Sequence, residues 1–99
     1  MKVKLISWNV NSIRARLQHI KKLIADVQPE IICLQETKVS NELFPKEFFL
    51  ESGFKHFYIN GIPSYNGVCI ISKLNASSSN SINWCSLKDG RHIMATWEK

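Results

Sequence analysis

The sequence predicts an α/β fold in which two parallel strands are joined by a helix. A strand-like segment comes first, an amphipathic helical segment follows, and a short apolar run comes after the helix. Strand, helix and strand in this order give a right-handed crossover, which pairs the two strands in parallel within one sheet. A chain of 99 residues is long enough for one domain at most, so residues 1–99 are treated as a single unit.

The first predicted strand is the segment KVKLISWNV, which ends near Asn9. Its period-two alternation and its β-branched and aromatic residues are typical of strands. A helix is expected next, with Ser12 as its N-cap and Pro29 beyond its end. Apolar residues recur along it at spacings of three and four and give it one apolar face; they are Ile13, Leu17, Ile20, Ile24 and Val27.

The second predicted strand is the apolar run EIICLQET, which is too short for a helix and suits a buried strand. The carboxyl ends of parallel strands meet at the same edge of a sheet. Asn9 and Glu36 are therefore expected to be neighbours. Ligands of α/β sheets bind beyond that edge, so the sequence predicts that a site lies there.

The rest of the chain predicts a short helix and four further strands. The segment NELFPKEFFLESG indicates the helix, with Phe44, Phe48 and Phe49 directed inward and Gly53 as its C-terminal stop. KHFYING and GVCIISK indicate strands that flank the turn IPSYNG. LNASSSNS is expected to be a polar loop, and INWCS and HIMATWEK to be two closing strands around LKDG.

Composition favours an intracellular protein and only weakly suggests a partner. A net charge of +5 and a pI near 9.3 favour anionic partners such as nucleic acid, but an ordinary basic protein explains them as well. No stretch has the length of a membrane span, and no signal peptide is recognisable, so we expect a cytoplasmic protein without membrane contact. No C-x-x-C pair is present, and reduced thiols without a structural zinc are expected for Cys33, Cys69 and Cys85.

Glu36 is the sharpest candidate for chemistry. A carboxylate at a strand end, beside an amide such as Asn9, offers the hard oxygen ligands that Mg²⁺ or Mn²⁺ prefers. Lys38, two residues on, is expected to face the same way and could hold a phosphate. Against this, the spacing alone favours Glu36 as a solvated strand end, and Asn9 and Asn11 as turn formers. The residues alone leave both interpretations open.

Two further segments carry weaker signals. Tyr65, Asn66 and Gly67 form a turn whose glycine lets the backbone approach another group closely, although a plain hairpin turn explains them as well. Arg91 either pairs with Asp89 on the surface or reaches a nucleic-acid phosphate.

Five segments in order resemble one known family. ISWNVNSIRARL, QPEIICLQETKV, FP, YNGVCIISK and DGRHIMA are similar to the exonuclease III family, the bacterial-type apurinic/apyrimidinic endonucleases of the endonuclease/exonuclease/phosphatase superfamily. The resemblance implies a four-layer α/β sandwich of the DNase I-like type, of which this chain would hold the N-terminal portion. It also implies a Mg²⁺-dependent repair nuclease that cuts duplex DNA 5′ to abasic sites and processes 3′ ends.

The resemblance also implies a role for each matched residue. Glu36 matches the metal-binding glutamate, Asn9 an asparagine that organises the metal and phosphate site, and Asn11 its supporting neighbour. Asn9 and Glu36 form the predicted catalytic pair, and Asn9, Asn11 and Glu36 the predicted metal site. DNA contacts are implied for Lys38, Tyr65, Asn66, Gly67 and Arg91.

The chain departs from the family pattern in two respects. Ser12 stands where the family usually has glycine. The family's later catalytic tyrosine, its GDxN motif and its SDH motif have no counterpart before Lys99. We therefore expect the isolated chain to be inactive and a complementing C-terminal chain to be a possible partner. The alternatives are a non-catalytic remnant that binds nucleic acid or a partner chain, and a phosphodiesterase for RNA, lipid or inositol phosphates.

Overall fold

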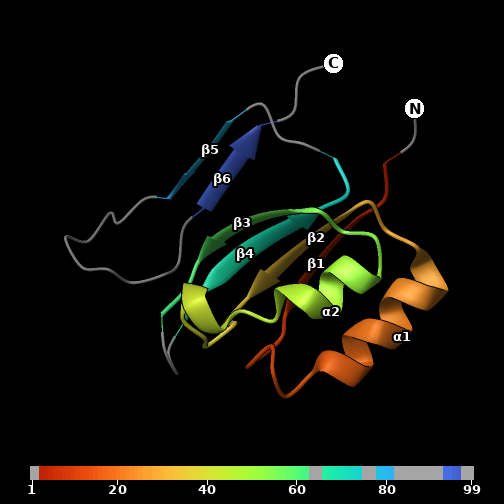
Figure 1. Ribbon diagram of the computed structural model, residues 1–99, viewed down its shortest axis with the longest axis horizontal. Coiled ribbons are helices and arrows are strands. Elements are labelled where there is room, and N and C mark those ends of the chain that lie inside the picture. Colours follow the sequence, from red (N-terminus) through yellow and green to blue (C-terminus); the bar gives the residue numbers. More distant parts are fainter. Residues whose placement is uncertain (1–2, 63–65, 75–77, 82–92, 97–99) are drawn as a thin grey trace.

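The computed structural model describes residues 3–62, 66–74, 78–81 and 93–96. Its elements, in chain order, are β1 (Leu5–Asn9), α1 (Leu17–Val27), β2 (Ile31–Gln35), the 3-10 helix η1 (Asn41–Leu43), α2 (Lys46–Glu51), β3 (His56–Asn60), β4 (Val68–Ser72), β5 (Ser78–Ser81) and β6 (Ile93–Thr96). Figure 1 shows the main sheet in the middle, with both α-helices on one side of it and a small second sheet on the other. Neither α-helix of the described residues has the length and apolar content that a membrane crossing needs.

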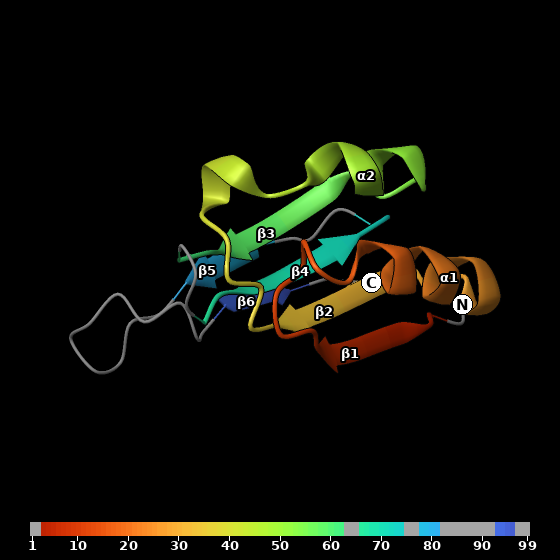
Figure 2. The ribbon, with the colours of Figure 1, turned by 90° about the horizontal axis from the view of Figure 1, so that it is seen from below.

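The main sheet has the strand order β1-β2-β4-β3, and β5 and β6 form the second sheet. β1 and β2 are parallel, with Ser7 opposite Cys33, and β4 is antiparallel to both β2 and β3. The predicted α/β class and its parallel pair are therefore confirmed. The helices, the main sheet and the second sheet follow one another as three layers from the bottom of Figure 1 to its top. Seen from below, the second sheet lies behind the main sheet (Figure 2). These layers agree with the sandwich architecture that the family resemblance implies.

Helix α1 begins later than predicted, and the expected N-cap role of Ser12 is wrong. The N-cap is Arg16, and Ser12 has a φ of 84°, in the left-handed region. The physical reason is that the backbone N–H of Ser12 donates to Glu36 O (2.8 Å) and that of Ile13 donates to Thr37 O (3.0 Å). These bonds hold residues 12–13 against the end of β2 and outside the helix.

The predicted apolar face of α1 is confirmed by Ile20 and Ile24, which are buried. Ile13, predicted to belong to the same face, is also buried but precedes the helix. The charged residues off this face, among them Lys22 and Asp26, are exposed and form an ion pair of 3.1 Å. The helix ends at Val27, and the left-handed backbone of Gln28 forms the C-cap.

Phenylalanines form the core beneath α2. Phe44, Phe49 and Phe54 are buried, and the Phe49 ring lies 5.9 Å from that of Phe44 and 6.4 Å from that of Phe54. The inward direction of Phe44 and Phe49 is thus confirmed, and Phe48 is half-buried at the edge of the core. Gly53 stops the helix as predicted, with a φ of 94° and its N–H bonded to Leu50 O.

Among the described residues of the C-terminal part, the structure differs from the sequence prediction at β5. The segment expected to be a polar loop contains the strand β5, which pairs with β6 in antiparallel register. Pairing with a neighbouring strand outweighs the low intrinsic β propensity of a serine-rich segment. The closing strand predicted in HIMATWEK is confirmed at Ile93–Thr96, and the one predicted at residues 82–86 lies outside the described residues.

Candidate functional site

The candidate site lies where β1 and β2 end side by side. In the parallel register Asn9 is opposite Gln35, and the N–H of Val10 donates to Gln35 O (2.9 Å). Beyond the two strands the chain segments stay side by side, because the backbone N–H groups of Ser12 and Ile13 donate to the carbonyl groups of residues 36 and 37. This alignment brings together residues that lie 27 positions apart in the sequence.

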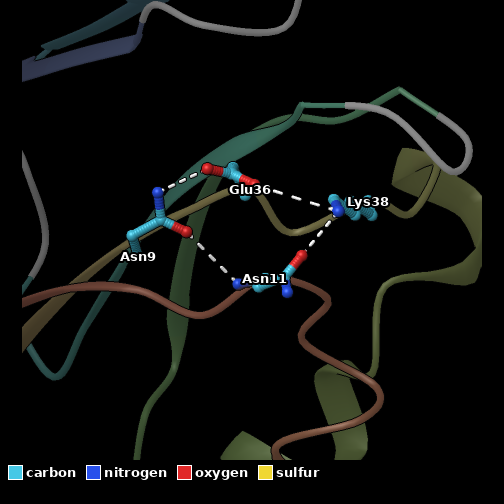
Figure 3. A network of polar contacts seen from close by, with 4 residues as sticks. All are labelled: Asn9, Asn11, Glu36 and Lys38. Carbon is cyan, nitrogen blue, oxygen red and sulfur yellow. Dashed lines mark hydrogen bonds and ion pairs between the residues drawn. The ribbon is translucent and has the colours of Figure 1, made fainter.

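Four of the predicted site residues form a closed ring of polar contacts (Figure 3). Asn9 Nδ2 donates to Glu36 Oε2 at 2.5 Å, and Asn9 Oδ1 accepts the backbone N–H of Asn11 at 3.3 Å. Lys38 Nζ donates to Asn11 Oδ1 at 2.5 Å and lies 3.8 Å from Glu36 Oε1. The predicted proximity of Asn9 and Glu36, and the predicted common direction of Glu36 and Lys38, are both confirmed.

The ring assigns different tasks to its members. An ionised carboxylate only accepts hydrogen bonds, so the amide group of Asn9 must turn its NH₂ toward Glu36 and its oxygen toward Asn11. Asn9 therefore orients Glu36. The side-chain oxygen of Asn9 already accepts a hydrogen bond from the backbone N–H of Asn11. The predicted role of Asn9 as a metal ligand therefore stays a prediction.

The site is built on strained backbone. Apart from Gln28 at the end of α1, the described non-glycine residues with positive φ, between 47° and 84°, lie in the three segments that surround it: Asn11, Ser12, Glu36, Lys38 and Asn66. The left-handed region is unfavourable for residues that carry a Cβ. Such residues persist where the surrounding structure holds them, and they concentrate at functional sites.

The turn before β4 closes the site from a third direction. Its backbone accepts two hydrogen bonds, from Thr37 N to Gly67 O (3.0 Å) and from Lys38 N to Asn66 O (2.7 Å). The predicted close backbone approach at Gly67 is confirmed, but its neighbour there is Thr37. DNA contact by Asn66 and Gly67 stays a prediction, and the predicted contacts of residues 65 and 91 lie outside the described residues.

The donor atoms fit a hard divalent cation. The Glu36 side chain is 41% exposed, and its Oε1 is the carboxylate oxygen that Asn9 does not occupy. Asn11 Oδ1 is a second oxygen nearby, bonded to Lys38. The described residues contain no cluster of three His, Cys, Asp or Glu side chains that could hold a metal. One carboxylate supplemented by water and substrate phosphate is a common arrangement for Mg²⁺.

Sequence reasoning missed Thr37. Its side chain is completely buried, whereas those of Glu36 and Lys38 on either side reach solvent. A signal was present, because residues i and i+2 of an extended segment share one side and the residue between them takes the other. Once Glu36 and Lys38 are predicted to face the site, Thr37 is expected to face the core.

Comparison with known proteins finds a matching family and several relatives. The family described as endonuclease/exonuclease/phosphatase matches residues 6–95. Exodeoxyribonuclease III of Haemophilus influenzae is 38% identical over 71 residues, which cover 72% of this chain and 26% of the relative. DNA-(apurinic or apyrimidinic site) endonuclease 2 of Xenopus laevis is 36% identical over 73 residues, which cover 72% of this chain and 14% of the relative.

Solved structures match the whole described fold. The 3′ phosphatase NExo from Neisseria, bound to a product DNA hairpin, aligns with a TM-score of 0.88 and 33% identity over 97% of this chain and 38% of that one. An AP endonuclease from Archaeoglobus fulgidus aligns with a TM-score of 0.84 and 34% identity over 95% of this chain and 37% of that one. The chain therefore spans well under half the length of these proteins.

Proposed function

The chain belongs to the endonuclease/exonuclease/phosphatase family, and on that premise we propose that it is the N-terminal part of a Mg²⁺-dependent DNA-repair nuclease. The proposed reactions are incision of duplex DNA 5′ to abasic sites and removal of nucleotides or phosphate from 3′ ends. The observation that carries the proposal is the Glu36 carboxylate, which Asn9 holds at the end of β2 beside the Lys38 ammonium. The names of the relatives, which include exodeoxyribonuclease III and a 3′ phosphatase bound to DNA, support DNA as the substrate.

Each residue of the ring has a task in this proposal. Glu36, supported by Asn11, would hold Mg²⁺ or Mn²⁺. A divalent cation bound there supplies charge neutralisation of the phosphate and Lewis acidity. Asn9 keeps the carboxylate in one orientation through its amide NH₂. Lys38, whose side chain is 33% exposed, lies close enough to the carboxylate to contact an oxygen of the same phosphate.

The ring supplies only part of a hydrolytic site. It contains one carboxylate. The 99 residues hold no counterpart of the catalytic tyrosine, the GDxN motif or the SDH motif that the family uses for the remaining chemistry. We therefore propose that the 99 residues alone bind metal weakly and do not hydrolyse DNA. Activity would then require a polypeptide that supplies the rest of the fold.

The surface beside β1 supports such a partner. Within the described residues β1 is an edge strand, and Leu5 and Val3 are 58% and 42% exposed. An open groove of about 360 Å³ lies along this edge, lined by Ile6, Ser7, Trp8, His19 and Leu23. Apolar side chains and an unpaired strand edge favour addition of a further strand.

An incision assay tests the proposal. The pure chain is incubated with Mg²⁺ and an end-labelled duplex that carries a single abasic-site analogue, alone and with a polypeptide that supplies the remaining portion of the Haemophilus relative. We expect no incision by the chain alone, incision by the mixture, and loss of that incision when the chain carries Glu36→Gln. Glu47→Gln, on the exposed side of α2, is the matched control and should leave incision unchanged.

Three results would count against the proposal. Incision by the pure chain alone, abolished by Glu36→Gln, would show that the described site is sufficient. A folded mixture that binds DNA without cutting it would favour the alternative of a non-catalytic binding protein. Cleavage of RNA, lipid or inositol phosphodiesters in preference to abasic DNA would reassign the substrate within the family.

A further inference from the structure

Thr37 is buried between two residues that reach the site. Its side chain has no solvent exposure, and its Oγ1 has no hydrogen-bond partner among the residues that the structure describes. A buried hydroxyl without a partner costs free energy. The hydroxyl forms no hydrogen bond that would fix Thr37 in place, so the position of Thr37 must depend on other contacts.

The backbone of Thr37 joins the three segments that surround the site. Its N–H donates to Gly67 O (3.0 Å), in the turn before β4, and its carbonyl accepts the N–H of Ile13 (3.0 Å), in the segment after β1. Thr37 itself belongs to the segment after β2. A displacement of Thr37 would therefore move both neighbouring peptides, those of Glu36 and Lys38.

Gly67 fits against Thr37 with no room for a side chain. A Cβ at this position would overlap Thr37 Oγ1 and would lie 3.5 Å from Thr37 Cβ and 3.3 Å from the backbone nitrogen of Lys38. Gly67 also has a φ of 91°, which glycine adopts readily. Space and backbone conformation thus both require glycine here.

We propose that Thr37 and Gly67 are positioning residues for the carboxylate site. Contact between them holds Glu36 and Lys38 at φ values of 54° and 55°, and this conformation directs both side chains toward Asn9 and Asn11. Left-handed backbone at two non-glycine residues needs such external support. That Thr37 and Gly67 position Glu36 and Lys38 is argued from the contacts alone. That this positioning serves catalysis rests on the proposed function.

The test compares two glycines of similar conformation. Gly53 has a φ of 94°, but the nearest atom to a Cβ there is Lys73 Cε at 3.7 Å, so alanine at this position brings backbone strain without overlap. We expect Gly67→Ala to lower the urea midpoint of unfolding more than Gly53→Ala does. We also expect only Gly67→Ala to shift the side-chain amide resonances of Asn9 and Asn11 in an ¹H–¹⁵N spectrum.

A second substitution provides the rescue. Thr37→Ala removes Oγ1, the atom that the new methyl group overlaps, together with Cγ2. The contacts that remain for the methyl group are the Lys38 nitrogen at 3.3 Å and the Cβ of residue 37 at 3.5 Å. The double variant Gly67→Ala with Thr37→Ala should recover most of the excess loss in midpoint and the native positions of the Asn9 and Asn11 amides. If the single Gly67 variant does not fold, the double variant decides: a folded double variant with native amides supports the inference, and an unfolded one overturns it.

Mn²⁺ separates this inference from the proposed function. Paramagnetic broadening of the Asn9 and Asn11 side-chain amides should be weaker in Gly67→Ala and should return in the double variant. If the unsubstituted chain shows no broadening, the proposed metal site fails, while the amide shifts and their rescue still support positioning. The positioning role is overturned, and the metal site stands, if broadening is present and equal in the unsubstituted chain and in Gly67→Ala. The positioning role is also overturned if Gly67→Ala and Gly53→Ala have the same urea midpoint and the same Asn9 and Asn11 amide resonances.

Discussion

Asn9 donates its side-chain amide to the Glu36 carboxylate at 2.5 Å, across 27 residues of sequence. The contact depends on the parallel register of β1 and β2, which sets the two strand ends side by side. It makes Asn9 part of the electrostatic environment of Glu36. A substitution that changes only the chemistry of this amide therefore reports directly on the site.

Asn9→Asp should lower stability without metal and strengthen metal binding. The new carboxylate would face Glu36, and repulsion between two exposed charges about 4 Å apart costs about 1 kcal/mol. The same pair offers more anionic oxygen ligands to a divalent cation. Urea unfolding in EDTA should show the loss, and titration with Mn²⁺ should show tighter binding than in the unsubstituted chain.

The control for this prediction is Asn41→Asp. Asn41 Oδ1 accepts the N–H of Gly61 at 2.7 Å, and a carboxylate can accept that bond equally well. This control should change neither stability in EDTA nor Mn²⁺ affinity appreciably. Equal stability of the Asn9 variant and the unsubstituted chain in EDTA would contradict the assigned contact.

Ser12→Gly should stabilise the chain by about 0.5–1 kcal/mol. Ser12 has a φ of 84°, which is strained for a residue with a Cβ and relaxed for glycine. The gain is partly offset because glycine loses more backbone entropy on folding. Thermal or urea unfolding measures the difference.

Ser40→Gly is the matched comparison, because Ser40 has a φ of −66° and gains nothing from the freedom of glycine. It should destabilise the chain by about 0.5–1 kcal/mol. Two serine-to-glycine changes are thus expected to have opposite signs. A loss of stability at Ser12 would show that its side chain contributes more than the strain removes.

The parallel pairing of β1 and β2 could be predicted from the sequence because it follows from general rules. Strand, helix and strand give a parallel pair, and a parallel pair brings Asn9 and Glu36 to one edge. The N-cap of α1 could not be predicted correctly. Ser12 is a favourable capping residue, but its backbone N–H bonds instead to the segment after β2, far away in the sequence. That bond exists only after β2 is in place.

The contact of Thr37 with Gly67 was beyond sequence reasoning for a related reason. Asn-Gly signals a turn wherever it occurs, but what the glycine packs against depends on how β4 aligns with β2. That alignment places Val68 opposite Gln35 and so brings the preceding turn to Thr37. Local signals predicted the elements, and the long-range pairings determined the site.

Phe49→Ala should destabilise the chain by about 3–5 kcal/mol. Phe49 has no solvent exposure, and its ring contacts those of Phe44, Phe48, Phe54 and Phe57. Truncation removes transfer free energy and leaves a cavity that the surrounding rings fill only in part. Such a loss is a large fraction of the stability of a small domain.

Leu50→Ala, the neighbouring position on α2, is the control for Phe49→Ala. Leu50 is 50% exposed, so its truncation should cost less than about 1 kcal/mol. Circular dichroism during urea unfolding compares the two variants. Similar losses at both positions would contradict the assignment of α2's buried face.

Alkaline pH should destabilise the chain through Cys69. Burial raises the pKa of this thiol above its ordinary value of 9.0, although a hydrogen bond with the Leu34 backbone partly opposes the shift. Burial also raises the pKa of the half-buried Cys33 thiol. Well below pH 9 both the folded and the unfolded chain keep these protons, so the cysteines leave stability unchanged there.

Above pH 9 the unfolded chain ionises first and binds fewer protons, so the free energy of unfolding falls by up to about 1.4 kcal/mol per pH unit for each affected thiol. Cys69→Ala removes the larger contribution, because Cys69 is buried in the core opposite Leu34. Its cavity cost does not depend on pH, and titration of lysines and tyrosines cancels in the comparison. Urea unfolding at intervals from pH 8 to pH 10.5 should therefore show the stability advantage of the unsubstituted chain shrinking as pH rises. A constant difference across this range would show that the Cys69 thiol ionises alike in both states.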